Sequence, residues 1–171
     1  PYTTLFRSGM NVIRVLAGRG AGPTALAAYD AALASVALHD YNLLRVSSVV
    51  PPDARVEPAE TAPDLGPAGN RLTVVEARST LAPGERGPAC AAIGWATPRA
   101  GAGVIYEGSG TDPGTTREEV REGLEAAQDL RADRDWAGGE AGLELSTAEP
   151  HPERYVVAVA LATFGRSEPI G

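Results

Sequence analysis

Apolar positions along the chain fall into segments with the two-residue period of strands and segments with the 3.6-residue period of helices. The strand-like segments are residues 11–18, 41–50, 71–81, 88–98, 103–109 and 154–165. Helical spacing occurs in residues 24–38 and again in residues 115–136. This order of strands and helices predicts an α+β fold in which helices cover the sheets.

Each predicted helix has one apolar face. The apolar positions are Leu26, Tyr29, Leu33 and Val36 in the first helix, and Val120, Leu124 and Ala127 in the second. Thr116 and Glu119 have the spacing of a capping box, so we expect the second helix to begin at Thr116.

The segments between these elements are rich in glycine and proline. Gly18, Gly20 and Gly22 follow the first strand and predict a tight turn into the first helix. The same glycines resemble a dinucleotide-binding loop, but Pro23 breaks the glycine spacing that such a loop requires, so we favour the turn. Residues 53–70 contain many Pro, Gly and Glu residues, and predict a loop.

The 171 residues, of which 43% are hydrophobic, suit one compact domain. No apolar run approaches the length of a membrane span, and no signal peptide is apparent. Residues 1–9 resemble a non-native N-terminal artefact before Met10. We therefore expect residues 10–171 to form the single domain.

The charge and the cysteine content exclude several classes of partner. All 15 basic residues are arginine, and 22 acidic residues give a net charge of −7, which argues against binding nucleic acid or an anionic membrane. The single Cys90 favours a reducing cytoplasm. His39 and His151 lie far apart in the sequence, so no metal site is expected.

The segment NLLRVSSVVPPDA, residues 42–54, places Ser47 and Ser48 side by side in a strand-like run that Pro51 and Pro52 end. Such hydroxyls commonly bond to neighbouring backbone or to water. A serine hydroxyl in a strained turn can instead attack the preceding carbonyl in an N→O acyl shift, and the resulting ester can break down to a pyruvoyl group.

Two carboxylates also interrupt apolar segments. Glu107 ends an apolar strand and is followed by glycine, so it is either a solubilising residue at a sheet edge or a site residue. A site role as a proton donor would be favoured by burial beside Ile105. Asp30 lies in a helix of alanine and leucine, where a lone aspartate usually faces solvent.

Residues 42–58, NLLRVSSVVPPDARVEP, resemble the pyruvoyl-dependent arginine decarboxylases. The resemblance extends through residues 22–38 and 91–108, and more loosely from Met10 to about Gly165. It implies a four-layer αββα sandwich, the fold shared with pyruvoyl-dependent histidine decarboxylase. It also implies decarboxylation of L-arginine to agmatine and CO2 in polyamine biosynthesis.

The resemblance further implies a covalent pyruvoyl cofactor. Cleavage between Ser47 and Ser48 would give chains 10–47 and 48–171, and Ser48 would become the pyruvoyl group, whose ketone binds the substrate amine. Asn42 would assist self-processing, Glu107 would be the catalytic acid, and Asp30 would bind the guanidinium. Substrate-binding positions would also include Leu26, Ser47, His39 and Tyr41. The family assembles as a homotrimer with sites between neighbouring subunits.

At His39 and Tyr41 an archaeal member of the family has Gly and Val, and these two residues could reshape the pocket. Two alternatives to the arginine decarboxylase remain open. One is the same chemistry on another amino acid. The other is an uncleaved, non-catalytic paralogue that acts as a structural or regulatory subunit, although such a subunit would not need Asn42, Ser48 and Glu107 together.

Overall fold

The computed structural model describes residues 12–171, and the expectations for residues 1–9 and Met10 concern residues outside this range. The described helices are α1 (Ala25–Ala34) and α2 (Pro113–Asp129). The described strands are β1 (Val12–Gly22), β2 (Asn42–Arg45), β3 (Val49–Val50), β4 (Arg55–Pro58), β5 (Arg71–Leu81), β6 (Ala89–Thr97), β7 (Gly103–Gly110), β8 (Glu140–Ala148) and β9 (Tyr155–Phe164). Neither helix is long and apolar enough to cross a membrane.

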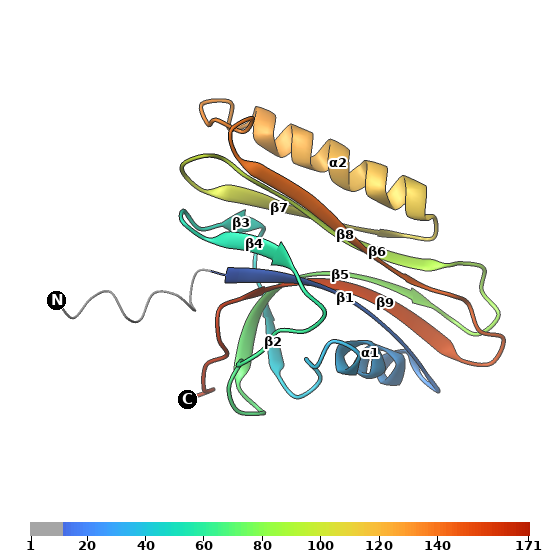
Figure 1. The fold of residues 1–171 in the computed structure, drawn as a ribbon. Coiled ribbons are helices and arrows are strands. Elements are labelled where there is room, and N and C mark those ends of the chain that lie inside the picture. The colour runs from blue at the N-terminus through green and yellow to red at the C-terminus, as the bar shows by residue number, and fades with distance from the viewer. Residues whose placement is uncertain (1–11) are drawn as a thin grey trace.

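The strands form two sheets that lie face to face. One is five-stranded with the order β2-β5-β9-β1-β4, and the other is four-stranded with the order β3-β7-β6-β8. Helix α1 packs on the outer face of the first sheet and α2 on the outer face of the second (Figure 1). The predicted α+β fold, a four-layer αββα sandwich, is confirmed.

The strand β9 shows how the core is built. It is central in the five-stranded sheet, between β5 and β1, and pairs antiparallel with both. Alternate residues of β9 face the space between the sheets and the space under α1. The first set is Val156, Ala158, Ala160 and Ala162, and the second is Val157, Val159 and Leu161. Burial of both faces explains why this strand is apolar throughout.

The three glycines after residue 17 do not form the predicted turn. Strand β1 continues through them to Gly22, and they lie against α1. A Cβ atom on Gly20 would lie 2.3 Å from the backbone nitrogen of Ala32, and one on Gly22 would lie 2.7 Å from that of Ala28. The glycines therefore let the helix backbone pack directly on the sheet.

The buried face of α1 also differs from the prediction. The small residues Ala28 and Ala32 are completely buried, together with Leu33, whereas Leu26 is 75% exposed. Close contact with a glycine-lined strand selects small helix residues, and the larger Leu26 lies on the far side. A search for large apolar residues at helical spacing could not detect this arrangement.

Helix α2 begins earlier than the capping box predicted. Asp112 is the N-cap, and its Oδ2 accepts a hydrogen bond of 2.7 Å from the Thr115 backbone nitrogen. This hydrogen bond lowers the pKa of the Asp112 carboxyl. Pro113 occupies the first helical position, where proline is tolerated, and Thr116 lies inside the helix.

The strands of the structure differ from the predicted ones in three places. Residues 41–50 form two strands in different sheets, β2 and β3, because the chain crosses between the sheets after residue 46. Part of the predicted loop 53–70 is β4, a short edge strand that pairs in parallel with β1. Strand β8 was not predicted. It pairs with β6, and its half-buried residues give no clear alternation.

The glycine contact gives a test of the fold. We expect Gly20→Ala to lower the free energy of unfolding by about 1–3 kcal/mol, because the new methyl group meets backbone atoms that cannot rotate away. Chemical denaturation measures the change. The control is Gly114→Ala in α2, where a Cβ would meet only the side chain of Asp112, 3.3 Å away. That variant should be unchanged or slightly stabilised, and equal losses in both would contradict the packing argument.

Candidate active site

The Ser47–Ser48 peptide lies where the chain passes from one sheet to the other. On one side of it, the Val46 backbone nitrogen donates to the Val74 carbonyl at 3.0 Å, which extends the pairing of β2 with β5. On the other side, the Ser48 carbonyl accepts from the Ile105 nitrogen at 2.9 Å, next to the pairing of β3 with β7. The geometry described here is that of the uncleaved chain.

The hydroxyl of Ser48 donates a hydrogen bond of 2.8 Å to Oε2 of Glu107. The carbonyl oxygen of Ser47 accepts a hydrogen bond of 3.1 Å from the Val49 nitrogen. A proton acceptor therefore lies at the hydroxyl, and an N–H donor lies at the carbonyl that this hydroxyl would attack. Glu107 is exposed in this chain, not buried beside Ile105 as the sequence led us to expect, because the short β3 leaves this part of β7 uncovered.

These residues line a cavity of about 420 Å³ at the edge of the four-stranded sheet. Its lining comprises Ser47, Ser48, Val49, Val104, Ile105, Tyr106, Glu107, Ala127 and Arg131. We call it the serine cavity. The sequence predicted Ser47, Ser48 and Glu107, whereas Tyr106 and Arg131 were not predicted.

A second cavity, of about 500 Å³, lies beside α1. It collects the four other predicted substrate-binding residues, and we call it the aspartate cavity. Its lining comprises Thr24, Leu26, Ala27, Tyr29, Asp30, Leu33, His39 and Tyr41. Asp30 is exposed, and among the ion pairs of residues 12–171 none involves its carboxylate.

Within one chain the two cavities are separate. They share no lining residue, and the helices that border them lie on opposite outer faces of the sandwich (Figure 1). Asn42 lines neither of them: its Nδ2 donates to the Gly69 carbonyl at 2.8 Å, at the start of β2. The predicted site residues thus fall into two groups in the chain.

A buried carboxylate, Glu76 on β5, connects the region of the aspartate cavity with the strand that leads to Ser47. Its side chain is 3% exposed and accepts a hydrogen bond of 2.8 Å from Nη2 of Arg45 on β2. It also accepts a hydrogen bond from the hydroxyl of Tyr29 on α1. The Arg78 guanidinium lies 4.3 Å from the centre of the Tyr29 ring. The cluster ties β2, β5 and α1 together.

The protonation states in this cluster follow from its contacts. Burial and the hydrogen bond to Glu76 raise the pKa of Tyr29 to about 12. The hydrogen bond to Glu76 also raises the pKa of Arg45. Near neutral pH the phenol is thus neutral and the guanidinium charged, and both donate to the carboxylate.

Different signals were available for the residues that the sequence analysis missed. Glu76 is the one acidic residue of the predicted strand 71–81, and Arg45 belongs to the same motif as the serines. Arg131 gave no signal, because it follows a helix whose charged residues indicate a solvated face. Among residues 12–171, no grouping of His, Cys, Asp and Glu could hold a metal ion.

The fold and the serine cavity together define a class: a two-sheet αββα protein with a serine hydroxyl bonded to a carboxylate where the chain changes sheets. Comparisons with known proteins agree with this class. The pattern of the family described as pyruvoyl-dependent arginine decarboxylase (PvlArgDC) matches residues 12–169.

Two relatives carry the same name. The pyruvoyl-dependent arginine decarboxylase of Halobacterium salinarum is 48% identical over 161 residues, which cover 92% of this chain and 96% of the relative. That of Methanopyrus kandleri is 30% identical over 155 residues, which cover 88% of this chain and 93% of the relative.

The chain belongs to the pyruvoyl-dependent arginine decarboxylase family. It is a carboxy-lyase, and membership implies a covalently bound pyruvoyl group. The described residues fit such a group, because the Ser48 side chain faces a cavity and has a proton acceptor beside it.

Proposed function

We propose that this chain cleaves itself between Ser47 and Ser48 and then decarboxylates L-arginine to agmatine and CO2, a step that feeds polyamine biosynthesis. The observation that carries the proposal is the 2.8 Å hydrogen bond from the Ser48 hydroxyl to Glu107, at the crossing between the sheets. The relatives named above are described as arginine decarboxylases, which supports the choice of substrate.

Self-cleavage begins with an N→O acyl shift. Glu107 takes the proton of the Ser48 hydroxyl as Oγ attacks the carbonyl carbon of Ser47. Negative charge develops on the Ser47 oxygen, where the Val49 N–H already donates. The C–N bond then breaks, the Ser48 nitrogen gains a proton, and an ester joins Ser47 to the Ser48 side chain.

The ester is then eliminated. A base removes the Ser48 α-proton, the Cβ–O bond breaks, and Ser47 leaves with a free carboxylate as the new C-terminus. The dehydroalanine at residue 48 takes up water and releases ammonia, which leaves a pyruvoyl group at the new N-terminus. No external oxidant or reductant is needed.

Both new ends have partners that cleavage does not remove. The short chain keeps the pairing of β2 with β5 and the ion pair between Arg45 and Glu76. The long chain keeps the hydrogen bond from Ile105 to the carbonyl of residue 48. Glu107 consequently stays beside the position of the group that forms.

The pyruvoyl group would supply a ketone for the substrate α-amine and an electron sink for the loss of CO2. The chain must then return a proton to the substrate α-carbon. Glu107 is the acidic side chain that lines the serine cavity, so we assign this proton to its carboxyl group.

We assign the binding of the substrate side chain to the aspartate cavity. A carboxylate can accept two parallel N–H bonds from a guanidinium, a geometry that the ammonium group of lysine does not offer. The aliphatic wall at Leu26 and Leu33 suits the methylenes of arginine. His39 and Tyr41 line the same cavity, so another amino acid with a cationic end is the second candidate substrate.

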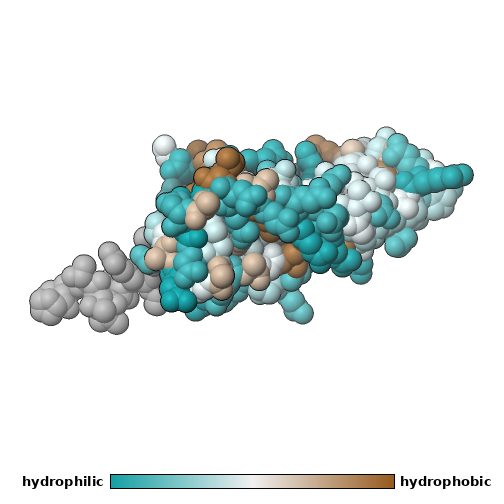
Figure 2. Space-filling view, turned by 90° about the horizontal axis from the view of Figure 1, so that it is seen from above, coloured by the Kyte–Doolittle hydropathy of each residue, from teal (hydrophilic) through white to brown (hydrophobic). Residues whose placement is uncertain are grey.

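We further propose that the complete site forms between two chains of a homotrimer. The two cavities are separate within one chain, and large apolar side chains around the serine pair are exposed. These residues are Leu44, Val46, Val49 and Tyr106. Figure 2 shows an apolar patch near the left-hand end of the face that α2 covers. A cyclic assembly would bring one chain's aspartate cavity to its neighbour's serine cavity.

We also propose a cytoplasmic location and no nucleic-acid partner. Cys90 is buried and free, and burial raises its pKa, which suits a thiol kept reduced in the cytoplasm. The net charge of −7 disfavours nucleic acid as a partner.

The first test is self-cleavage. Denaturing mass spectrometry should find a short chain that ends at Ser47 and a long chain of residues 48–171 that resists Edman sequencing. Ser48→Ala should give one intact, inactive chain. A wild-type protein that stays intact after long incubation would contradict the proposal and favour a non-catalytic paralogue.

Glu107→Gln tests the two roles of the carboxylate. We expect it to slow both self-cleavage and decarboxylation by roughly 10²–10⁴-fold, because the amide can neither accept nor donate the proton. Gel time courses follow the cleavage, and CO2 release per cleaved chain follows the turnover. Unchanged rates with a folded protein would remove Glu107 from the mechanism.

Asp30→Asn tests both the substrate and the shared site. Loss of the carboxylate should cost about 2–4 kcal/mol in kcat/KM for arginine, while cleavage at Ser48 continues. Asp30→Asn chains are also mixed with an equal amount of Ser48→Ala chains before assembly. Roughly a quarter of the sites should then be active, because such a site takes its serine cavity from an Asp30→Asn chain and its aspartate cavity from a Ser48→Ala chain. If mixing restores nothing, the two halves do not meet between chains.

A further inference from the structure

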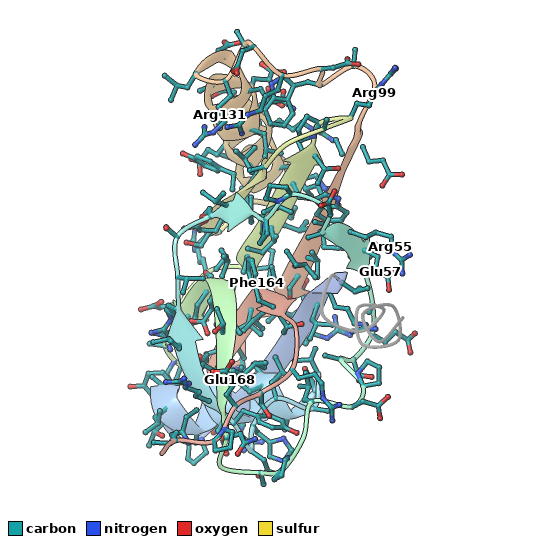
Figure 3. All side chains as sticks on the ribbon, turned by 90° about the vertical axis from the view of Figure 1, so that its left-hand side faces the viewer. Arg55, Glu57, Arg99, Arg131, Phe164 and Glu168 are labelled. Carbon is teal, nitrogen blue, oxygen red and sulfur yellow. The ribbon has the colours of Figure 1, made fainter. Side chains whose placement is uncertain are left out.

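The lining of the serine cavity includes an arginine that none of the steps above uses. Arg131 follows α2 and, in the part of the chain that the structure describes, is the basic residue in the lining of this cavity. Figure 3 shows Arg131 beside the end of α2, on the opposite side from Arg99. A positive charge therefore borders the space into which Ser48 and Glu107 face.

Both the side chain and the backbone of Arg131 are held in place. Its Nη1 donates to the Ala127 carbonyl at 2.8 Å, and the Trp136 indole nitrogen donates to the backbone carbonyl of Arg131 at 3.0 Å. A guanidinium has five N–H donors, so one such bond leaves donors for a ligand. Among the ion pairs of residues 12–171, none involves Arg131.

The reaction brings one anionic group into this cavity. The substrate α-carbon has to reach both residue 48 and Glu107, and the carboxylate that becomes CO2 is bonded to that same carbon. It must therefore lie in the serine cavity during turnover. A guanidinium can bind such a carboxylate through two parallel hydrogen bonds.

We propose that Arg131 binds the α-carboxylate of the amino-acid substrate, an assignment that rests on the function proposed above. The contact exists in the bound substrate and disappears when CO2 leaves. It should therefore contribute to substrate affinity more than to the chemical step, and favour the amino acid over its amine product. Arg131 would thus recognise one end of the substrate while Asp30 of another chain recognises the other.

A purely structural role has to be separated from this one, because arginine side chains often bond to the last carbonyls of a helix. The chain offers a matched control for that purpose. Arg134 is also half-buried, and its Nη1 donates to the Ala102 carbonyl at 2.7 Å, but it does not line the serine cavity.

The experiment compares Arg131→Gln, Arg131→Lys and Arg134→Gln with the wild type, using three ligands. L-Arginine has the carboxylate, agmatine lacks it, and L-arginine methyl ester has it neutralised. KM and kcat are measured for arginine, and competitive inhibition constants are measured for the other two. Calorimetry measures agmatine binding directly. All values are expressed per cleaved chain, counted by mass spectrometry, so that slow processing does not distort them.

For Arg131→Gln we expect KM for arginine to rise by about 10–100-fold, the range for loss of a charge-assisted hydrogen bond. kcat should change much less, and the constants for agmatine and the ester should stay within about twofold. Arg131→Lys should recover part of the loss because it restores the charge. Arg134→Gln should match the wild type.

Two results would overturn the assignment. A parallel loss of affinity for all three ligands would mean that Arg131 only shapes the cavity, and an unchanged KM for arginine would mean that it does not contact the carboxylate. Failure of the proposed function is a different outcome, in which the wild type releases no CO2 from arginine. If the wild type acts on another amino acid, the same comparison with that amino acid and its amine decides the role of Arg131.

Discussion

The hydrogen bonds on either side of the Ser47–Ser48 peptide are the constraint on which the site depends. Val46 is held by the five-stranded sheet, and the carbonyl of residue 48 is held by Ile105 in the other sheet. Each sheet is covered by its own helix on the outer face, and the inner faces of the two sheets form one common core. Because the two anchors belong to different layers of one packed core, the proposed cleavage of the peptide between them would leave both ends in place.

A cluster of charged and polar side chains also holds β2, the strand that leads to Ser47, against α1. The Glu76 carboxylate is buried, and a buried carboxylate is stable only with strong donors around it. Arg45 and Tyr29 provide these donors, from the strand that leads to Ser47 and from the helix that carries Asp30. One ion-pair cluster therefore positions both the strand that leads to Ser47 and the helix that borders the aspartate cavity.

Packing sets the position of that helix equally closely. Gly20 and Gly22 let the backbone of α1 lie directly against β1, closer than any residue with a Cβ atom would allow. Burial of Ala28 and Ala32 turns the opposite side of the helix, with Leu26, towards solvent. Leu26 and Asp30 consequently border a surface cavity that a substrate or a neighbouring chain can reach.

Local patterns were sufficient for the strongly apolar strands, for both helices and for the fold class, because burial imposes its period on the residues themselves. They also singled out the serine pair and Glu107, which interrupt that period. They failed where the partner of a residue lies far away in the sequence. The glycines of β1 indicate a turn until α1 is placed on them, and residues 41–50 form one strand until two sheets compete for them.

The sequence by itself determined Ser47, Ser48, Asp30 and Glu107 as candidates for the chemistry, since hydroxyls and carboxylates inside apolar segments are visible without coordinates. Only the tertiary structure decided which of them meet. It joined Ser48 to Glu107, added Arg131 to their cavity, and placed Asp30 in a different one. The physical reason is that a site is made by contacts between layers, and such contacts depend on how sheets and helices pack, which no local period records.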